Sequence, residues 1–551
     1  MKLADNLVNL TLSILLTQAI QAGAATAPPI VNLGYAQYQG ITVQDVVTNA
    51  THTEFLGMRY AAPPTGTRRF GAPAAPATTP GVQLANAEPS TCLQGGEGLA
   101  PATPFRINPH RIAKPVTKRA MDATAVGVTE DCLFLNVFIP GNLGARKDLP
   151  VIFFIHGGGY VEGSETNLDG NDLIRGSGEG VLVVTIQYRV GLFGFLPGQK
   201  VKDGGALNAG LLDQQFALKW VQQHISKFGG DPLKVAIWGQ SAGAGSVLQH
   251  VIANGGKTNP PLFRAAITSS TFLPSQYHFN DRIPETLYNE TVAQTNCSSA
   301  ADTLNCLRNA DLNTLQTANK VINSSGFFGT FVFVPVVDGT FITDRPTQLL
   351  KEKKINGQAL LSVTNTFEGT GFVNQSTADT VQVTNYVSQL FPNLGTTDAQ
   401  TAAAMYASAG LGSNINQAIG IVGESIIICP TYYLLRAFGE SAFKGEFAIP
   451  PGLHAGDVPY YFTHGRPPPF ANVDFDKAFG ESYMDFALSL NTNVKWDPTN
   501  PRPSWDAWNG SNEMLFNKTV AGAPDIRLIK TSNALLSRCD FWNSVSASTA
   551  Q

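Results

Sequence analysis

Short, nearly continuous apolar runs alternate with a helically spaced segment in the first half of the chain. Residues 130–140, 151–155, 181–188 and 235–238 have the pattern of buried strands, and 211–225 has the pattern of a helix. Apolar strands joined through helices are typical of a mostly parallel sheet with both faces covered. The pattern therefore predicts an α/β fold with a large central sheet, helices on both faces and long loop insertions.

A tight turn follows the predicted strand 235–238. Residues 239–243 read Gly-Gln-Ser-Ala-Gly, and residues 244–251 continue with helical spacing. Glycines two positions before and after a serine allow strand and helix to pack closely, so that the serine hydroxyl is exposed above the sheet. This strand–turn–helix sequence predicts the α/β-hydrolase fold, with Ser241 as the nucleophile.

A glycine-rich segment follows the predicted strand 151–155. It reads His-Gly-Gly-Gly over residues 156–159. Backbone N–H groups that no side chain obstructs can stabilise the negative charge that develops on a carbonyl oxygen in a transition state. We expect Gly158 and Gly159, together with Ala242 after the nucleophile, to form an oxyanion hole.

The composition narrows the choice of partners. The chain has 551 residues, of which 43% are hydrophobic and 14% charged, and its formal net charge is −4. Such a charge provides no broad basic surface, so binding to nucleic acid is not expected. The sequence has no clustered set of metal ligands, and we predict neither a metal nor another cofactor. It predicts no particular oligomeric state.

The first 24 residues have the pattern of a secretory signal peptide. A lysine precedes an apolar stretch from Leu7 to Ile20, and small residues around Ala24 offer a cleavage site. A membrane anchor is the alternative, but polar residues interrupt the stretch and it is short for a membrane span. No later run is judged long and apolar enough to span a bilayer. We expect a soluble secreted protein with one domain over residues 25–551.

Six cysteines in an oxidising compartment suggest disulfides. Proximity in sequence favours Cys92–Cys132 and Cys297–Cys306, which leaves Cys429 and Cys539. A secreted chain also offers N-glycosylation sites in Asn-x-Ser/Thr triplets. The candidates are Asn49, Asn289, Asn323, Asn374, Asn509 and Asn517, with Asn296 disfavoured by its neighbour Cys297.

The segment between Cys92 and Cys132 has no clear periodicity and is rich in glycine, proline and basic residues. Long loops of this kind in compact enzymes are usually functional. With a disulfide at its base, the loop at about 92–132 would form a lid over the site. The alternative is a solvated surface loop without a gating role.

Several segments resemble the type-B carboxylesterase/lipase family, which includes cholinesterases and fungal lipases. The resemblance is carried by residues 130–140, 156–160, 208–214 and 228–243, and it extends to residues 539–543. It implies a secreted serine ester hydrolase, closest in character to the fungal carboxylesterases and lipases. The alternatives are a true lipase activated at an interface through the lid and, less favoured, a non-catalytic adhesion protein on the same fold.

The nucleophile needs a histidine base and an acid that orients this base. His454 opens a His-Ala-Gly-Asp segment that resembles the family's catalytic histidine, and it is preferred over His464, which follows an apolar strand in a turn. Glu368 follows the apolar strand 360–364 and resembles the family's catalytic glutamate. Asp338 is the rival acid, although an Asp-Gly pair is typical of a turn.

The resemblance also implies a Cys429–Cys539 disulfide, as in cholinesterases. Some fungal members lack this bond, which leaves two buried thiols as the alternative.

The substrate pocket and the surroundings of the triad are expected from the same resemblance. Phe331 and Phe333 align with aromatic residues of the family's acyl pocket, with ordinary core packing as the alternative. Gln240 stands where many relatives have glutamate. Ser269 and Asp457 are expected beside the triad, with Ser269 in contact with Glu368.

The same positions argue against a cationic substrate. Gln240 removes a negative charge from the site, and no tryptophan lies between Cys92 and Cys132, where cholinesterases hold their cationic substrate. We therefore expect a small-molecule or lipid ester that is not a choline ester.

Overall fold

The computed structural model describes residues 28–106, 127–166, 168–464 and 467–551. The expected signal peptide, residues 1–24, lies outside the described residues, as do residues 107–126 of the expected lid.

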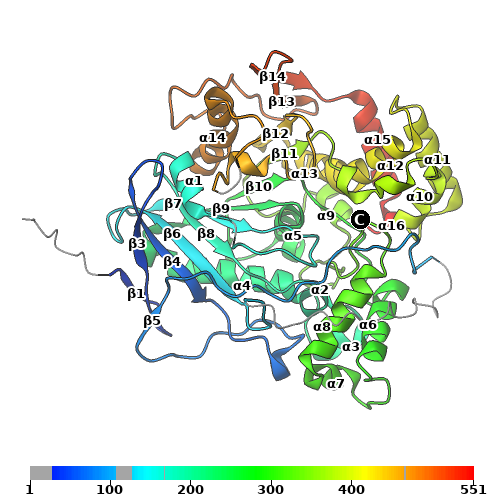
Figure 1. Cartoon of the computed structure of the whole chain (residues 1–551), viewed down its shortest axis with the longest axis horizontal. Helices are drawn as coiled ribbons and strands as arrows, with labels where there is room; N and C mark the ends of the chain where they lie inside the picture. Colours follow the sequence, from blue (N-terminus) through cyan, green and yellow to red (C-terminus); the bar gives the residue numbers. More distant parts are fainter. Residues whose placement is uncertain (1–27, 107–126, 167, 465–466) are drawn as a thin grey trace, which may run out of the picture.

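An 11-stranded sheet forms the centre of the molecule, in the order β14-β13-β12-β11-β10-β9-β7-β8-β6-β4-β3 (Figure 1). The strands from β8 to β13 in this order pair in parallel, whereas the strands at both ends pair antiparallel. The α/β fold with a large, mostly parallel sheet is therefore confirmed.

The strands of this sheet are β3 (Ile41–Gln44), β4 (Thr51–Arg59), β6 (Phe134–Pro140), β7 (Leu149–Ile155), β8 (Leu182–Ile186), β9 (Gly230–Gln240), β10 (Ala265–Ser269), β11 (Ala359–Asn365), β12 (Ala442–Phe447), β13 (Asn512–Lys518) and β14 (Pro524–Lys530). A small second sheet contains β1 (Ile30–Asn32), β2 (Gln37–Gln39) and β5 (Val82–Leu84).

The α-helices are α1 (Gly170–Gly176), α2 (Gly191–Phe195), α3 (Gln199–Gly204), α4 (Ala209–His224), α5 (Ala242–Gly256), α6 (Arg282–Gln294), α7 (Thr303–Asn309), α8 (Leu312–Ser324), α9 (Pro346–Lys351), α10 (Val383–Leu390), α11 (Thr396–Ala407), α12 (Asn414–Gly423), α13 (Cys429–Phe438), α14 (Val473–Ser489), α15 (Asn533–Ser544) and α16 (Ser546–Thr549). A π-helical turn, η5 (Glu424–Ile428), joins α12 to α13.

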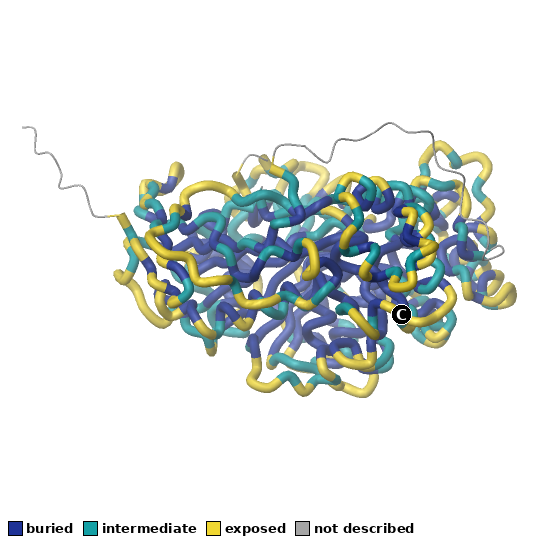
Figure 2. The backbone as a smooth tube through the Cα atoms, turned by 90° about the horizontal axis from the view of Figure 1, so that it is seen from below, coloured by how far each residue is buried: buried dark blue, intermediate teal, exposed yellow. Residues whose placement is uncertain are grey.

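Helices cover both faces of the sheet and divide the core in two. On one face α4, α5 and α13 pack against the strands, and on the other α1 and α14 do so. Successive side chains of β9 point to opposite faces of the sheet, so Ile237 belongs to the first core layer and Trp238 to the second. In Figure 2 the buried backbone forms a continuous central layer beneath an exposed rim.

The sequence led us to expect no later apolar run long enough for a membrane span, but the structure has a continuous helical run, Asn414–Ser441, that meets this description. It is long enough for a membrane span and has a mean hydropathy of 1.6, but 83% of its most apolar window is buried inside the protein. Its apolar character comes from core packing, because α13 lies between the sheet and α15 and the buried side chains of α12 and η5 belong to the same core.

Three disulfides join the six cysteines. The pairs are Cys92–Cys132, Cys297–Cys306 and Cys429–Cys539. The described start of the 92–132 loop packs on α10, where the backbone N–H of Thr103 donates to Gln389 Oε1 over 2.8 Å and Arg106 donates to the Ser388 carbonyl over 2.9 Å.

The candidate glycosylation sites differ in exposure. Asn49, Asn289 and Asn509 are exposed, whereas Asn374 and Asn517 are partly buried. Asn323 is fully buried in α8, and its amide donates to the Asn319 carbonyl over 2.8 Å. An amide used inside the core cannot carry a glycan in the folded protein, so Asn323 was a wrong candidate.

Candidate active site

Ser241 lies at the junction of β9 and α5, in a backbone conformation that few residues adopt. Its φ is 57° and its ψ is −123°. A Cβ on Gly239 would lie 2.2 Å from the backbone of Gly243, and a Cβ on Gly243 would lie 2.0 Å from the Ile155 carbonyl oxygen. Both glycines are therefore required by close backbone contacts, and this packing holds the serine in its strained geometry.

The structure brings Ser241, His454 and Glu368 together from three distant parts of the chain. His454 Nε2 lies 2.9 Å from Ser241 Oγ, and His454 Nδ1 lies 2.6 Å from Glu368 Oε2. Glu368 follows β11, and His454 lies in the loop that follows β12. Because these strands run parallel to β9, their carboxyl ends meet at the same edge of the sheet.

The remaining oxygen of Glu368 is held by two short hydrogen bonds. Ser270 Oγ donates to Glu368 Oε1 over 2.7 Å, and the backbone N–H of Asn365 donates over 2.6 Å. The carboxyl side chain is fully buried, and these donors, together with His454, engage both of its oxygens.

The serine in contact with Glu368 is Ser270, and the expectation of Ser269 was wrong. Ser269 is the last residue of β10, and its hydroxyl accepts from Trp238 Nε1 over 3.2 Å on the other face of the sheet. Ser270 lies just beyond the strand with a φ of 62°, so its side chain turns toward the acid.

Asp457 is separated from Glu368 by one intervening side chain, that of Asn365. Asn365 Nδ2 donates to Asp457 Oδ1 over 3.0 Å, and Tyr461 donates to Asp457 Oδ2 over 3.1 Å. Burial raises the pKa of the Asp457 carboxyl. Asp457 therefore reaches Glu368 only through Asn365.

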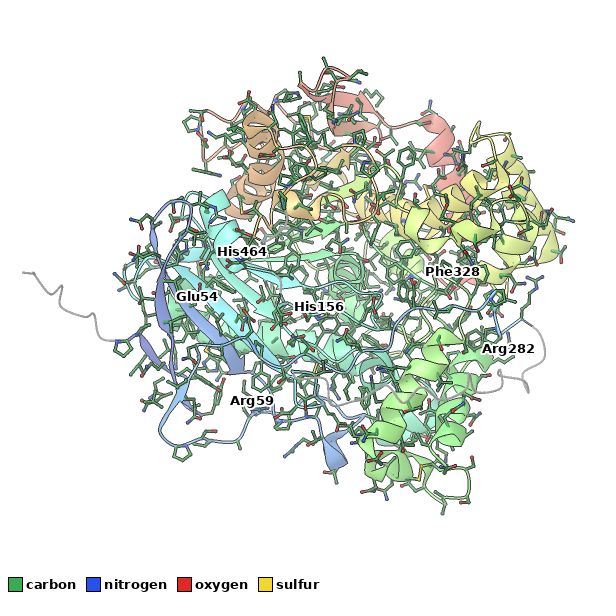
Figure 3. All side chains as sticks on the ribbon, viewed as in Figure 1. Glu54, Arg59, His156, Arg282, Phe328 and His464 are labelled. Atoms are coloured by element: carbon green, nitrogen blue, oxygen red, sulfur yellow. A yellow bond between two sulfur atoms is a disulfide. The ribbon has the colours of Figure 1, made fainter. Side chains whose placement is uncertain are left out.

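Asp338, the rival candidate for the acid, and His464, the rival candidate for the base, lie in other environments. Asp338 Oδ2 accepts from Asn208 over 2.6 Å, while its Oδ1 accepts from the backbone of its own turn. His464 has an exposed side chain, and its backbone N–H donates to Asp172 over 2.8 Å. In Figure 3 this histidine is labelled nearer to Glu54 than to His156.

Gly158 and Gly159 have positive φ angles of 103° and 62°. A Cβ on Gly158 would lie 2.1 Å from the Glu162 carbonyl, and one on Gly159 would lie 2.2 Å from the ring of Phe331. The backbone N–H groups of both glycines have no acceptor among the described residues. Ala242, the first residue of α5, follows the nucleophile directly, so its N–H also belongs to an uncapped helix start.

His156 is a buried, neutral side chain directly before the glycine loop 157–159. Burial lowers its pKa to about 4. Its ring stacks on Tyr188 with 4.3 Å between centroids, and the Tyr188 hydroxyl donates to the His156 carbonyl over 2.9 Å. The ring thus fixes the path of the backbone that leads into Gly158 and Gly159.

An apolar cavity, partly open to solvent, begins beside the triad. Phe331 and Phe372 line it, and the Phe372 ring lies 5.2 Å from the His454 ring. Its further lining comes mainly from Phe272, Val334, Ile283, Leu287, Leu390 and Ile426. These side chains favour an apolar group of a ligand.

Phe333 does not line this cavity. It is fully buried in the core, whereas its neighbours Val332 and Val334 face the cavity with Phe331. The acyl-pocket expectation is therefore wrong for Phe333, and the core alternative describes it. Gln240 lies at the site itself, with its Nε2 3.4 Å from His454 Nε2.

Sequence reasoning missed Ser270, Asn365 and Phe372. Asn365 and Phe372 lie within four residues of Glu368, so the signal was proximity to the acid along the chain. Ser270 gave no separate signal, because three of its neighbours are also serine or threonine. Within the described ranges, no group of three or more histidine, cysteine, aspartate or glutamate side chains could hold a metal.

Comparisons with known proteins identify the family of this chain. The family model described as "Carboxylesterase family" matches residues 27–522. Carboxylesterase patB of Aspergillus clavatus is 30% identical over 97% of this chain and 99% of its own length. Secreted lipase 1 of Botryotinia fuckeliana is 34% identical over 62% of this chain and 61% of its own.

The crystal structure of Aspergillus niger EstA superposes with a TM-score of 0.82 at 30% identity, covering 95% of this chain and 99% of that one. The chain therefore belongs to the carboxylesterase family. It is a carboxylesterase/lipase-type hydrolase with an α/β-hydrolase fold.

Proposed function

We propose that the protein is a secreted serine hydrolase of carboxylic esters that acts through an acyl-enzyme on Ser241. The observation that carries the proposal is the pair of contacts at 2.9 and 2.6 Å that joins Ser241 through His454 to Glu368. In this arrangement His454 takes the serine proton as the hydroxyl attacks the ester carbonyl. The same proton then passes to the leaving alcohol.

Glu368 holds His454 in the required tautomer and stabilises the imidazolium that forms. The N–H groups of Gly158, Gly159 and Ala242 bind the oxyanion of each tetrahedral intermediate. Water then enters, loses a proton to His454 and releases the acid product. Every step uses residues of this chain, and none requires a cofactor.

The apolar cavity supports an ester with an apolar acyl group. Phe331 packs against Gly159, so a chain attached to a carbonyl in the oxyanion hole would extend into this cavity. Among the described residues, the lining has no carboxylate, which agrees with a neutral substrate.

Secretion and domain organisation are part of the same proposal. The signal-like residues 1–24, three disulfides and relatives named secreted lipases support export of residues 25–551 as one domain. Asn49, Asn289 and Asn509 are the exposed glycosylation candidates, with Asn374 and Asn517 less accessible.

A true lipase is the second candidate. It is favoured by the apolar lining of the cavity and by relatives named lipases. Turnover of a triglyceride measured across its solubility limit separates the two: a lipase gains activity when the emulsion forms, whereas an esterase is already saturated by dissolved substrate.

The decisive test is Ser241→Ala, assayed on p-nitrophenyl acetate with circular dichroism as the control for folding. Removal of the nucleophile in a triad lowers kcat by about 10⁵- to 10⁶-fold. Wild-type protein should also release a burst of p-nitrophenol equal to its concentration of sites. Folded Ser241→Ala protein with wild-type turnover would refute the mechanism.

A further inference from the structure

The segment that follows α15 is buried against one wall of the apolar cavity. Residues 546–549 form α16, and Gln551 has an exposed fraction of only 2%. The side-chain amide of Gln551 donates two hydrogen bonds, to the Leu273 carbonyl over 2.7 Å and to the Ser425 carbonyl over 2.8 Å. One amide group thus bridges two pieces of backbone that are far apart in the sequence.

Both bridged carbonyls belong to segments that line the cavity. Phe272 and Pro274 flank Leu273, and Ile426 follows Ser425. The backbone N–H of Leu273 also donates to the Ile426 carbonyl over 2.8 Å. Gln551 therefore reinforces a direct contact between these two parts of the wall.

Two more hydrogen bonds fix the Gln551 segment in place. The backbone N–H of Gln276 donates to the Ala550 carbonyl over 2.5 Å, and Thr347 Oγ1 donates to the backbone oxygen of Gln551 over 2.5 Å. Gln276, Thr347 and Gln551 are all buried. In such surroundings hydrogen bonds are strong, and a carbonyl that loses its donor is costly.

The wall itself needs this support at η5. Ser425 lies in the π-helical turn, and such turns recur at functional sites because they interrupt the regular helix ladder. The backbone between α12 and α13 thus departs from helical regularity where it faces the cavity, and the Gln551 amide satisfies one of its carbonyls.

We propose that Gln551 is a positioning residue for substrate selectivity. Its amide holds segments 272–276 and 422–426 in the arrangement that binds the acyl chain of longer esters. This proposal rests on the proposed function, in which the cavity receives the acyl group. Short acyl groups such as acetyl do not reach this wall and are not affected by its position.

The test is Gln551→Met, which keeps the volume of the side chain and removes the amide donors. The matched control is Gln222→Met on α4, because Gln222 Nε2 also bridges two carbonyls, of Pro232 over 2.8 Å and of Leu262 over 3.0 Å, far from the cavity. Both variants are assayed on p-nitrophenyl acetate and p-nitrophenyl octanoate, with sites counted by the burst.

For Gln551→Met we expect kcat/KM for octanoate to fall about fivefold while that for acetate stays within about twofold, as suits the loss of one buried hydrogen-bonded link. Gln222→Met should leave the ratio of the two substrates unchanged. An equal fall for both substrates in Gln551→Met, an unchanged ratio or a raised ratio overturns the proposal.

Thr347→Val provides the answer if Gln551→Met does not fold. It removes the donor to the backbone oxygen of Gln551 with little change of shape, so it should lower the octanoate-to-acetate ratio in the same direction by a smaller factor. An unchanged ratio in Thr347→Val then overturns the proposal. If wild-type protein lacks acetate turnover, the proposed function fails instead, so the two failures are distinguishable.

Discussion

The two sides of the candidate site are built in different ways. On the polar side, backbone geometry sets the positions of the site residues. A Cβ added to Gly239, Gly243 or Gly159 would lie within 2.2 Å of another atom. On the apolar side, the cavity wall is made of side chains from the loop after β10 and from α6, α10 and η5, held by packing and by the Gln551 amide. In the proposed function the reaction thus depends on short rigid motifs, whereas the selectivity depends on long-range packing.

Glu368→Gln should have the largest effect of the substitutions that separate these two sides. An amide cannot stabilise the imidazolium and favours the wrong tautomer of His454, so kcat falls by about 10⁴-fold. The loss should be equal for acetate and octanoate esters, measured as kcat with counted sites. A loss confined to one chain length would show that Glu368 also shapes the cavity.

The pH dependence of stability tests the role of His250, a buried residue of α5, the helix that follows Ser241. Burial lowers its pKa to about 3, so in the folded protein it stays neutral while an unfolded histidine binds a proton below about pH 6.5. Stability is therefore lost as pH falls from 6.5 toward 3, by about 3 kcal/mol between pH 6.5 and 4.

His250→Gln should flatten this acid limb in urea unfolding at pH 7 and pH 4. The exposed His278→Gln is the control and should retain the wild-type slope. If both variants keep the full acid loss, other buried groups cause it.

Phe331→Leu tests the apolar side, with Phe333→Leu as its matched control. Phe331 lines the cavity, so the smaller side chain should lower kcat/KM for octanoate by about tenfold and that for acetate much less. Phe333 is a core residue, and its substitution should lower the melting temperature and leave the ratio of substrates unchanged. The reverse result would restore Phe333 to the pocket.

Ser270→Ala and Ser269→Ala should show the smallest difference. Ser270 donates to Glu368 over 2.7 Å, so its loss should lower kcat/KM by about fivefold for both esters, as expected for one hydrogen bond to a charged group. Ser269→Ala should stay within about twofold. Equal effects of the two substitutions would contradict the assignment.

Local patterns predicted those parts of the molecule whose residues are close together along the chain, whereas Glu368, His454 and the Cys429–Cys539 disulfide were expected from the family resemblance. The elbow around Ser241 and the glycines 157–159 carry their constraints within five residues, and the fold class followed from strand and helix periodicity. Ser269 and Phe333 were wrong because each required the orientation of one side chain at a strand end or in a loop. The helical run Asn414–Ser441 was misjudged because its length shows only once α12, η5 and α13 are known to be continuous, and Asn323 was wrong because a triplet motif does not report burial.

The Gln551 bridge lay beyond sequence reasoning altogether. It joins three segments separated by more than a hundred residues, and no motif marks a glutamine whose partners are backbone carbonyls. Such contacts can be found only once the packing of α16 against the cavity wall is known.

The Cys429–Cys539 disulfide has a mechanical consequence. The bond spans a sequence separation of 110, and β12, His454, α14 and β13 all lie between its two cysteines. Tension applied to residues on either side of this ring would pass through the sulfur atoms and bypass the enclosed chain. In a single-molecule stretching experiment the fully extended protein should therefore be about 370 Å longer after reduction of this bond.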